Sequence, residues 1–410
     1  MRTLPTLAPA LSALLLLACG DGGGAGGSGG SGGTTGTGGS SSSSSSGSTS
    51  SGTASSSSGS GAGPSCSSFA EAARITSHTI SGASSARAVT AQRGDGSIVA
   101  WPGADGSIHV LPLDAADAPA GAEITVEGTD VFGAAATATD VALLVSRPPD
   151  FVTFVRLDNA GAKLASADLV GGGDHATVGV EWFGEFARTG RLVSRADGTY
   201  AAYHALHRRW PDNVGHQGDT LRLLGADGKA LSGGWDWGCS HSMDQRLATG
   251  PNGLVPICIA DCYPGKGIYF NHQAAQITPD PGANCAGGYT TQLGGLVAVK
   301  DGFFLVYGDA SLAGHLGHFD ATGKPISDRA LTESPQARLA VYGDGLLLGT
   351  PRSTGMGIVK LDAAGEPTGD AADISPDLPV HDFESRADGE VAWASVHADT
   401  LTVVRVRKCQ

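Results

Sequence analysis

The sequence predicts an all-β fold, a seven-bladed β-propeller, from three observations. A two-residue turn followed by an apolar strand recurs seven times, at spacings of 43 to 58 residues. A second turn, of the form Asp-Ala-x-Gly, lies between several of these copies and divides each unit into four strands. The last unit lacks a strand that an orphan strand near the N-terminus can supply. Four short strands in each of seven repeats are typical of a propeller. A β-sandwich or a solenoid of similar strands is the alternative.

The first turn marks the inner hairpin of each blade, because Asp-Gly or Asn-Gly between alternating runs is a strong hairpin signal. The seven copies are Asp95-Gly96, Thr139-Asp140, Asp197-Gly198, Asn252-Gly253, Asp301-Gly302, Asp344-Gly345 and Asp388-Gly389. Thr139-Asp140 is the degenerate copy. The second turn is clearest at 157–161, 319–323 and 361–365, and looser at 113–117 and 224–228.

The ring is expected to close within the last blade. That blade has three predicted strands, at 381–387, 390–396 and 400–407. The orphan strand at 73–81 precedes the first copy and would supply the missing outer strand. Both ends of a propeller domain spanning 66–410 would therefore meet in one sheet.

Residues 1–18 have the features of a secretory signal, with Arg2 before an apolar stretch. Residues 16–19, Leu-Leu-Ala-Cys, resemble the lipobox of bacterial lipoproteins. The resemblance implies a lipidated Cys19 and a membrane contact through the lipid anchor alone. In this family an Asp after the Cys is the usual inner-membrane retention signal. Gly20 occupies that position, so the resemblance implies an exported protein of the cell envelope, at the outer membrane. The alternative is an ordinary signal peptide that ends near a Cys.

Residues 19–65 are expected to form the lipidated Cys and a disordered Gly/Ser linker, since they cannot bury enough apolar surface to offset ordering entropy. A Gly-rich coil of this length spans roughly 37 Å. The chain carries 26 Lys and Arg against 40 Asp and Glu, a net charge of −14, and has no basic stripe. Nucleic acid is therefore excluded as an expected partner.

Six cysteines remain after Cys19, and an even number in an exported chain indicates disulfides. Cys66 and Cys409 stand at the two ends of the domain, so we expect a disulfide between them. The other four are Cys239, Cys258, Cys262 and Cys285, all in blade four. The turn near Asn252 gives strand partners whose numbers sum to about 503. This register favours Cys239–Cys262 with Cys258–Cys285 over the other two pairings. A zinc site is the alternative, because Cys258-x3-Cys262 has a suitable spacing.

The loops that connect strands B to C and D to A share one face of a propeller. In this sequence they contain most of the candidate functional side chains, and we call this side the loop-rich face. By this interpretation nine of the twelve histidines, all except His78, His109 and His397, lie at or near that face. The candidate ligand-binding residues are His175, Arg208, Trp210, Trp235, Trp237, His315 and His381. The tryptophans could stack on a sugar or a peptide, or fill gaps between blades.

The sharpest group joins blades three and four: His216, Asp219, His241 and Asp244. Imidazole and carboxylate together suit a single transition metal, with His216, Asp219 and His241 as ligands. They equally suit general acid–base catalysis. Turn capping is the structural alternative.

Three functions follow from these observations. The first is binding of a protein, peptide or glycan through the loop-rich face. The second is a metal-assisted or acid–base hydrolase or lyase at the seam between blades three and four. The third is an interaction scaffold in an envelope complex, which predicts a flat apolar patch or an exposed strand edge.

Overall fold

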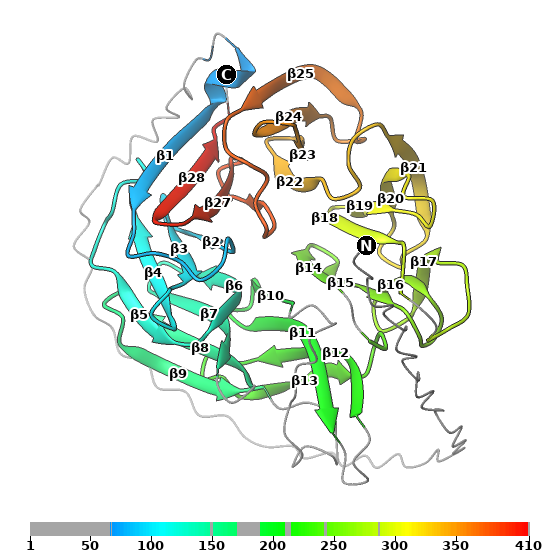
Figure 1. The fold of residues 1–410 in the computed structure, drawn as a ribbon, viewed down its shortest axis with the longest axis horizontal. Coiled ribbons are helices and arrows are strands. Elements are labelled where there is room, and N and C mark those ends of the chain that lie inside the picture. The colour runs from blue at the N-terminus through cyan, green and yellow to red at the C-terminus, as the bar shows by residue number, and fades with distance from the viewer. Residues whose placement is uncertain are drawn as a thin grey trace, which may run out of the picture. The chain divides into compact units, whose positions relative to one another are not determined.

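The computed structural model describes residues 66, 68–147, 151–169, 189–209, 215–241, 244–285 and 288–408, without the side chains of 206–209 and 215–216. Seven four-stranded sheets lie in a ring around a central channel (Figure 1). Every strand pair in these sheets is antiparallel, and strands A to D run from the channel outward. The prediction of a seven-bladed β-propeller is confirmed.

The first four blades have the following strands. They are β2 (Val89–Arg93), β3 (Gly96–Pro102), β4 (Ser107–Leu113) and β5 (Ile124–Glu127); β6 (Asp130–Ala136), β7 (Asp140–Arg147), β8 (Phe151–Asp158) and β9 (Lys163–Asp168); β10 (Gly190–Ser194), β11 (Tyr200–Arg209), β12 (Gly215–Leu224) and β13 (Ala230–Asp236); and β14 (Gln245–Gly250), β15 (Gly253–Ala260), β16 (Gly267–Phe270) and β17 (Ala275–Pro279).

The last three blades complete the ring, and one short 3-10 helix precedes β1. The elements are β18 (Gln292–Val299), β19 (Gly302–Gly308), β20 (Gly314–Phe319) and β21 (Pro325–Leu331); β22 (Arg338–Tyr342), β23 (Gly345–Pro351), β24 (Met356–Leu361) and β25 (Pro367–Ile374); and β26 (Glu384–Ser385), β27 (Val391–His397), β28 (Thr400–Val406), η1 (Phe69–Ala72) and β1 (Ala73–Thr79). None of the helices in the described residues is long or apolar enough to cross a bilayer.

The ring closes in blade seven, as the orphan strand predicts. β1 pairs with β28 along its whole length, from Ala73 opposite Val406 to Thr79 opposite Thr400. The Arg407 N–H donates to the Ala72 carbonyl at 3.0 Å, which extends the contact between the two ends. The first and last strands of the propeller therefore lie side by side (Figure 1).

Local side-chain chemistry fixes the C–D turns. In blade two, Asp158 Oδ1 accepts hydrogen bonds from the backbone N–H of Ala160 at 2.9 Å and Ala162 at 2.8 Å. Asp114, Asp320 and Asp362 do the same in blades one, five and six. Gly161 closes the turn with a φ of 84°, which favours glycine. The Asp-Ala-x-Gly marker is thus an aspartate-capped turn.

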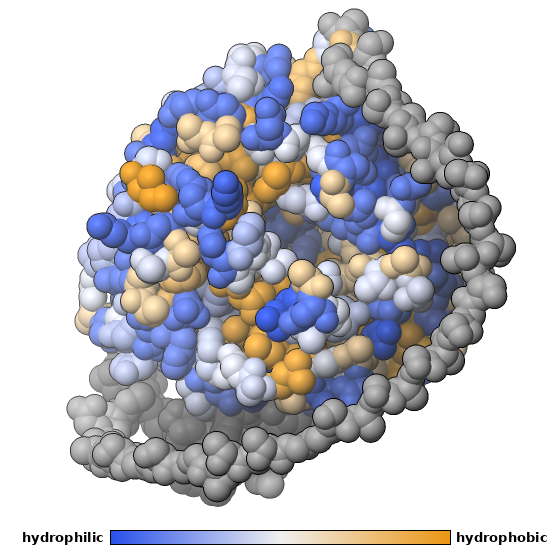
Figure 2. All heavy atoms as spheres, turned by 180° about the vertical axis from the view of Figure 1, so that it is seen from behind, coloured by the Kyte–Doolittle hydropathy of each residue, from blue (hydrophilic) through white to orange (hydrophobic). Residues whose placement is uncertain are grey.

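The core lies between blades rather than within one sheet. The second strands β3 and β19 are buried along their whole length, because neighbouring blades cover both faces. The outermost strand β21 is mostly exposed. Figure 2 shows one face of the molecule, where hydrophilic residues cover most of the surface and apolar residues form small, separate groups.

The disulfide pairing favoured by the sequence is wrong. The structure joins Cys239 to Cys258 and Cys262 to Cys285. The register sum of 503 is correct inside the sheet, where Gln245 lies opposite Cys258. However, β14 begins only at Gln245, so the register does not extend back to Cys239. The zinc alternative is wrong too, since the two sulfurs of Cys258-x3-Cys262 belong to different disulfides. Cys66 is disulfide-bonded, and its predicted partner Cys409 lies outside the described residues.

Candidate functional site

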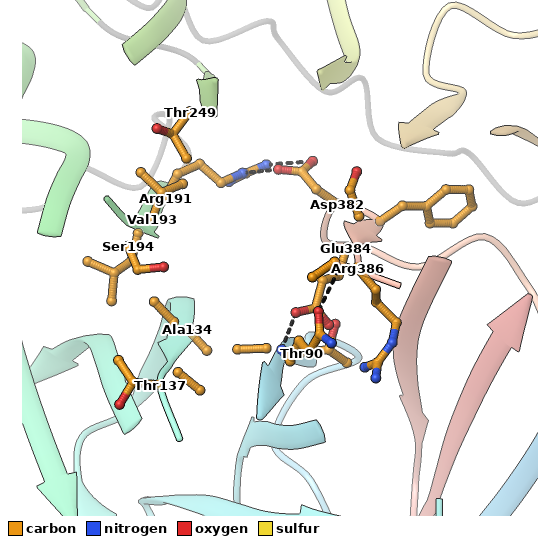
Figure 3. Close-up of a pocket in the computed structure, with 18 of the residues that line it drawn as sticks. Thr90, Ala134, Thr137, Arg191, Val193, Ser194, Thr249, Asp382, Glu384 and Arg386 are labelled. Atoms are coloured by element: carbon orange, nitrogen blue, oxygen red, sulfur yellow. Dashed lines mark hydrogen bonds and ion pairs between the residues drawn. The ribbon is translucent and has the colours of Figure 1, made fainter. Parts of the chain in front are cut away.

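The central channel holds a cavity of about 660 Å³. The inner strands β2, β6, β10 and β14 and the segment 381–387 line it, so five blades contribute side chains. Figure 3 shows the Arg191 and Asp382 side chains extended toward each other at one end of this cavity. Arg191 and His381 also line a second cavity of about 290 Å³. The Arg191–Asp382 pair therefore marks the boundary between two compartments of the channel.

Three contacts cross the channel at this boundary. Arg191 in blade three donates to Asp382 through Nε and through Nη2, the latter at 3.2 Å from Oδ1. Arg246 in blade four places Nε 3.4 Å from Asp382 Oδ1. His381 Nε2 lies 2.9 Å from the carbonyl oxygen of Phe132 in blade two. Blade seven is a sequence neighbour of none of these blades, so these contacts hold opposite sides of the ring together.

Four arginines line the smaller cavity: Arg87, Arg191, Arg246 and Arg338. Three carboxylates pair with three of them, Asp130 with Arg87 at 2.7 Å, Asp244 with Arg246 at 2.6 Å and Asp382 with Arg191. Arg338 instead donates to the carbonyl oxygens of His381, Gln336 and Val380 at 2.9 to 3.0 Å. We call this group the arginine pocket.

Burial and the neighbouring arginines together set the pKa values here. Burial alone would raise the pKa of Asp382, but Arg191 and Arg246 outweigh burial and hold it far below its usual range. Burial, with Arg191 close by, lowers the pKa of His381 to about 3, so this imidazole is neutral. Burial, with Arg246 close by, lowers the pKa of Arg338 to about 10. The arginine stays charged at neutral pH, although its surroundings disfavour that charge.

Glu384 lines the larger cavity, and its neighbours offset only part of the cost of burying its negative charge. Burial raises the pKa of its carboxyl to about 7, against the opposing effect of Arg386. The Gln92 N–H donates to Oε1, whereas Oε2 has no hydrogen-bond partner among the described residues. Among the described side chains that line this cavity, only Glu384 has a pKa raised to about 7.

The described members of the predicted seam group have different hydrogen-bond partners. Asp219 is fully buried and accepts hydrogen bonds from the Tyr203 hydroxyl and, at 2.9 Å, from the Cys239 N–H. His241 Nδ1 lies 2.8 Å from Asp261, and its backbone N–H donates to Gln217. Asp244 turns to Arg246 in the arginine pocket. His216 pairs with Arg208 in the backbone register, and its side chain lies outside the described residues.

Within the described part of the chain, one group of three metal-ligating atoms lies within 4.8 Å: Asp219, Cys239 and Cys258. The two sulfurs form a disulfide, which removes the thiolates that a metal would need. The predicted metal set of His216, Asp219 and His241 stays a prediction, because the side chain of His216 lies outside the described residues. In the structure, Asp219 holds the backbone at Cys239 in place through its hydrogen bond to the Cys239 N–H.

The remaining candidate ligand-binding residues have diverse positions. Trp235 packs between blades, edge-on to Tyr203 at 5.5 Å and stacked on His272 at 4.9 Å. Trp237 begins the next connection with a φ of 59°. His315 lies between Asp328 at 3.0 Å and Asp309 at 3.3 Å. His175, Trp210 and the side chain of Arg208 lie outside the described residues.

Two histidines assigned to the loop-rich face lie elsewhere. His318 stands 3.3 Å from Asp301, at the A–B turn of blade five, because β20 runs from the loop end at Gly314 to the turn end at Phe319. His272 is in the C–D turn of blade four, between β16 and β17. The histidine count on the loop-rich face is therefore lower than the sequence suggests.

The arginine pocket was not anticipated, although the sequence contains a signal for it. An Arg-Leu pair stands seven residues before the turn glycine in three blades: Arg191-Leu192, Arg246-Leu247 and Arg338-Leu339. Asp382 stands at the same position in blade seven, before Gly389. Equivalent positions on inner strands point to the same level of a propeller channel, so this repeat could have revealed the pocket.

No protein-family model and no curated protein sequence matches the chain. Two propellers of solved structure are similar to it. The Dos1 propeller has 11% sequence identity and a TM-score of 0.45, over 76% of this chain and 77% of that one. The WD40 β-propeller domain of Doa1 has 9% identity and a TM-score of 0.46, over 81% and 96%. At these values the likeness concerns the fold alone.

Proposed function

We propose that this chain is a binding protein that engages a ligand or a protein partner through its loop-rich face. The main support is the distribution of exposed apolar side chains. Of the eight large ones in the described residues, four lie on connecting loops of that face: Tyr263, Tyr289, Leu312 and Val380. The other four lie on outermost strands: Ile75, Leu164, Leu231 and Ile326. None of the eight lies in an A–B or C–D turn.

The channel cavities add to this support. Tyr289 and Val380 also line the arginine pocket, so exposed apolar side chains and buried positive charge adjoin on one face. Apolar anchors around a concave polar site are typical of ligand-binding surfaces. The scaffold alternative predicts a flat apolar patch or an exposed strand edge, and the apolar residues on the face in Figure 2 form only small, separate groups. The full burial of Asp219 and its bond to Tyr203 disfavour this carboxyl as the acid or base of a hydrolase or lyase at the seam.

A matched pair of double variants tests the proposal. Tyr263→Ser with Leu312→Ser removes side chains that are 63% and 53% exposed on the loop-rich face. Leu164→Ser with Ile326→Ser removes side chains that are 49% and 53% exposed on outermost strands. Immobilised full chain should capture a specific envelope protein, peptide or glycan, the loop variant should lose it and the strand variant should keep it. Equal capture by all three proteins would contradict the proposal.

The proposal includes attachment to the cell envelope through Cys19, which lies outside the described residues. It rests on the lipobox-like residues 16–19 and the Gly/Ser composition that follows. Metabolic labelling with a radioactive fatty acid should mark the full chain in a bacterial host, and Cys19→Ser should abolish the label. Several acyl chains hold a protein far more firmly than one. Release of wild-type chain by a salt wash would argue against the anchor.

A further inference from the structure

We propose that the arginine pocket binds an oxyanion, the carboxylate or phosphate group of a ligand that enters from the loop-rich face. This deepens the proposed function and rests on it. Its basis is the charge inside the pocket. Four guanidinium groups converge there from blades one, three, four and six, and three carboxylates pair with three of them. Among the described residues, the pocket thus has one more positive than negative charge, in a chain whose net charge is −14.

Arg338 supplies that surplus. Within the described residues it has no carboxylate within 4 Å and donates to three carbonyl oxygens only. These bonds use Nε–H and one N–H from each terminal nitrogen, so two of the five N–H donors remain without a described partner. The side chain is 9% exposed, and the three carbonyls fix its plane. A guanidinium held in this way is preorganised for a planar, two-point contact with a carboxylate or phosphate.

The shape of the pocket suits a small charged group. Its volume of about 290 Å³ is close to the lower end of the range for small-molecule sites. Thr189, Gln336 and Tyr289 line it beside the arginines and offer neutral hydrogen-bonding groups. Burial makes each charge–charge contact stronger than at the surface.

The structural alternative is that these arginines only link the inner strands of neighbouring blades through hydrogen bonds. Arg246 supports that role, since it donates to Gly294 and Leu293 in blade five as well as to Asp244. The same role is played elsewhere by Arg386, which is 4% exposed and donates to Gly96 and Ser97 in blade one. Such linking accounts for bonds to carbonyl oxygens. It does not account for three buried guanidiniums and the half-buried Arg87 meeting around one cavity with three carboxylates.

Calorimetric titration of the full chain with two probes tests the inference: inorganic phosphate, and citrate as the carboxylate probe. Ionic strength is held constant with sodium chloride. We expect saturable binding of at least one probe with one site per chain. Arg338→Gln should weaken it at least tenfold, whereas Arg386→Gln, the buried control, should leave it within a factor of two. The probe that binds identifies the class of oxyanion.

Several outcomes would overturn the inference. These are the absence of saturable binding of both probes to the wild-type chain, or an equal loss in both variants. If Arg338→Gln fails to fold by circular dichroism, Arg87→Gln decides, since that side chain is 21% exposed and its removal disturbs less. Capture of a partner without binding of either probe would refute the oxyanion site and leave the proposed function standing. Binding of a probe without capture of any partner would refute the proposed function and leave the oxyanion site standing.

Discussion

Arg191 and Asp382 form an ion pair across the central channel, from blade three to blade seven. These residues are separated by 191 positions in sequence, and neither lies in a blade next to the other. Arg246 approaches the same carboxylate from blade four. One carboxyl group thus links three blades at the level where the two cavities meet. The pair stabilises the ring by a route independent of contacts between neighbouring blades.

Asp382→Asn should therefore destabilise the propeller by about 3 kcal/mol, because it leaves two buried guanidiniums facing a neutral amide. The loss is measured as a change in the free energy of unfolding by urea at pH 7. Asp373→Asn is the matched control, since it breaks an exposed pair in which Asp373 is 80% exposed. Exposed pairs contribute about 0–1 kcal/mol. Similar losses in the two variants would mean that the cross-channel pair is no stronger than a surface pair.

Glu384 should make stability depend on pH in an unusual direction. Its pKa is raised from 4.5 to about 7 in the folded state, so the folded chain binds more protons than the unfolded chain between these values. Stability from this group is full below about pH 4.5 and is lost as pH rises through about 7. Glu384→Gln should thus be neutral at pH 4.5 and stabilising at pH 8, by about 1–2 kcal/mol after allowance for partial exposure.

Urea unfolding of wild type and Glu384→Gln at pH 4.5, 6 and 8 measures this effect as the difference between the two proteins. Other titrating groups, Asp382 among them, change both proteins equally and cancel. Glu390→Gln is a useful control, because the pKa of Glu390 is also raised by burial but the group lies outside the channel cavity. A Glu384→Gln difference that stays constant from pH 4.5 to 8 would show that the carboxyl does not titrate near neutrality.

The fold could be predicted from sequence because its signals are local. The C–D turns of blades two, five and six are each built by one aspartate and a glycine three residues later, and Asp158 and Gly161 show the chemistry within four residues. A repeated local signal can be recognised even when one copy is degenerate, as Thr139-Asp140 is among the A–B turns. Closure was predictable for the same reason, since the missing strand and the orphan strand are both local patterns.

The site could be predicted only in part because its contacts are not local. Arg191 meets Asp382 through the geometry of the ring, and no sequence spacing encodes that meeting. The predicted disulfide pairing was wrong for a related reason. The chain leaves the sheet after β13 and turns through positive φ values at Trp237 and His241, so a strand register cannot place Cys239. The usable signal is the charged residue seven positions before the turn glycine in blades three, four, six and seven.

The two blade-four disulfides should differ in their resistance to reduction. Cys239 and Cys258 are buried, at 0% and 1% exposure, whereas Cys285 is exposed. Because reductant must reach a sulfur atom, mild dithiothreitol under native conditions should open Cys262–Cys285 first. Alkylation followed by peptide mass spectrometry gives the order and also checks the pairing. Labelling of Cys239 before Cys285, or a peptide joining Cys239 to Cys262, would contradict the structure.

The C–D turns should also hold neighbouring blades together, and two glycines can separate this effect from backbone strain. Gly198 and Gly323 have φ values of 77° and 83°, so alanine at either site incurs the left-handed cost of about 1–2 kcal/mol. A Cβ on Gly198 meets no atom within 4 Å, whereas a Cβ on Gly323 would lie 2.7 Å from the Phe270 ring in blade four. Gly323→Ala should therefore cost about 1–3 kcal/mol more than Gly198→Ala in urea unfolding. Equal losses of unfolding free energy in the two variants would mean that the blade-five turn is not closely packed against blade four. Gly323 would then be required only for the backbone conformation of its turn.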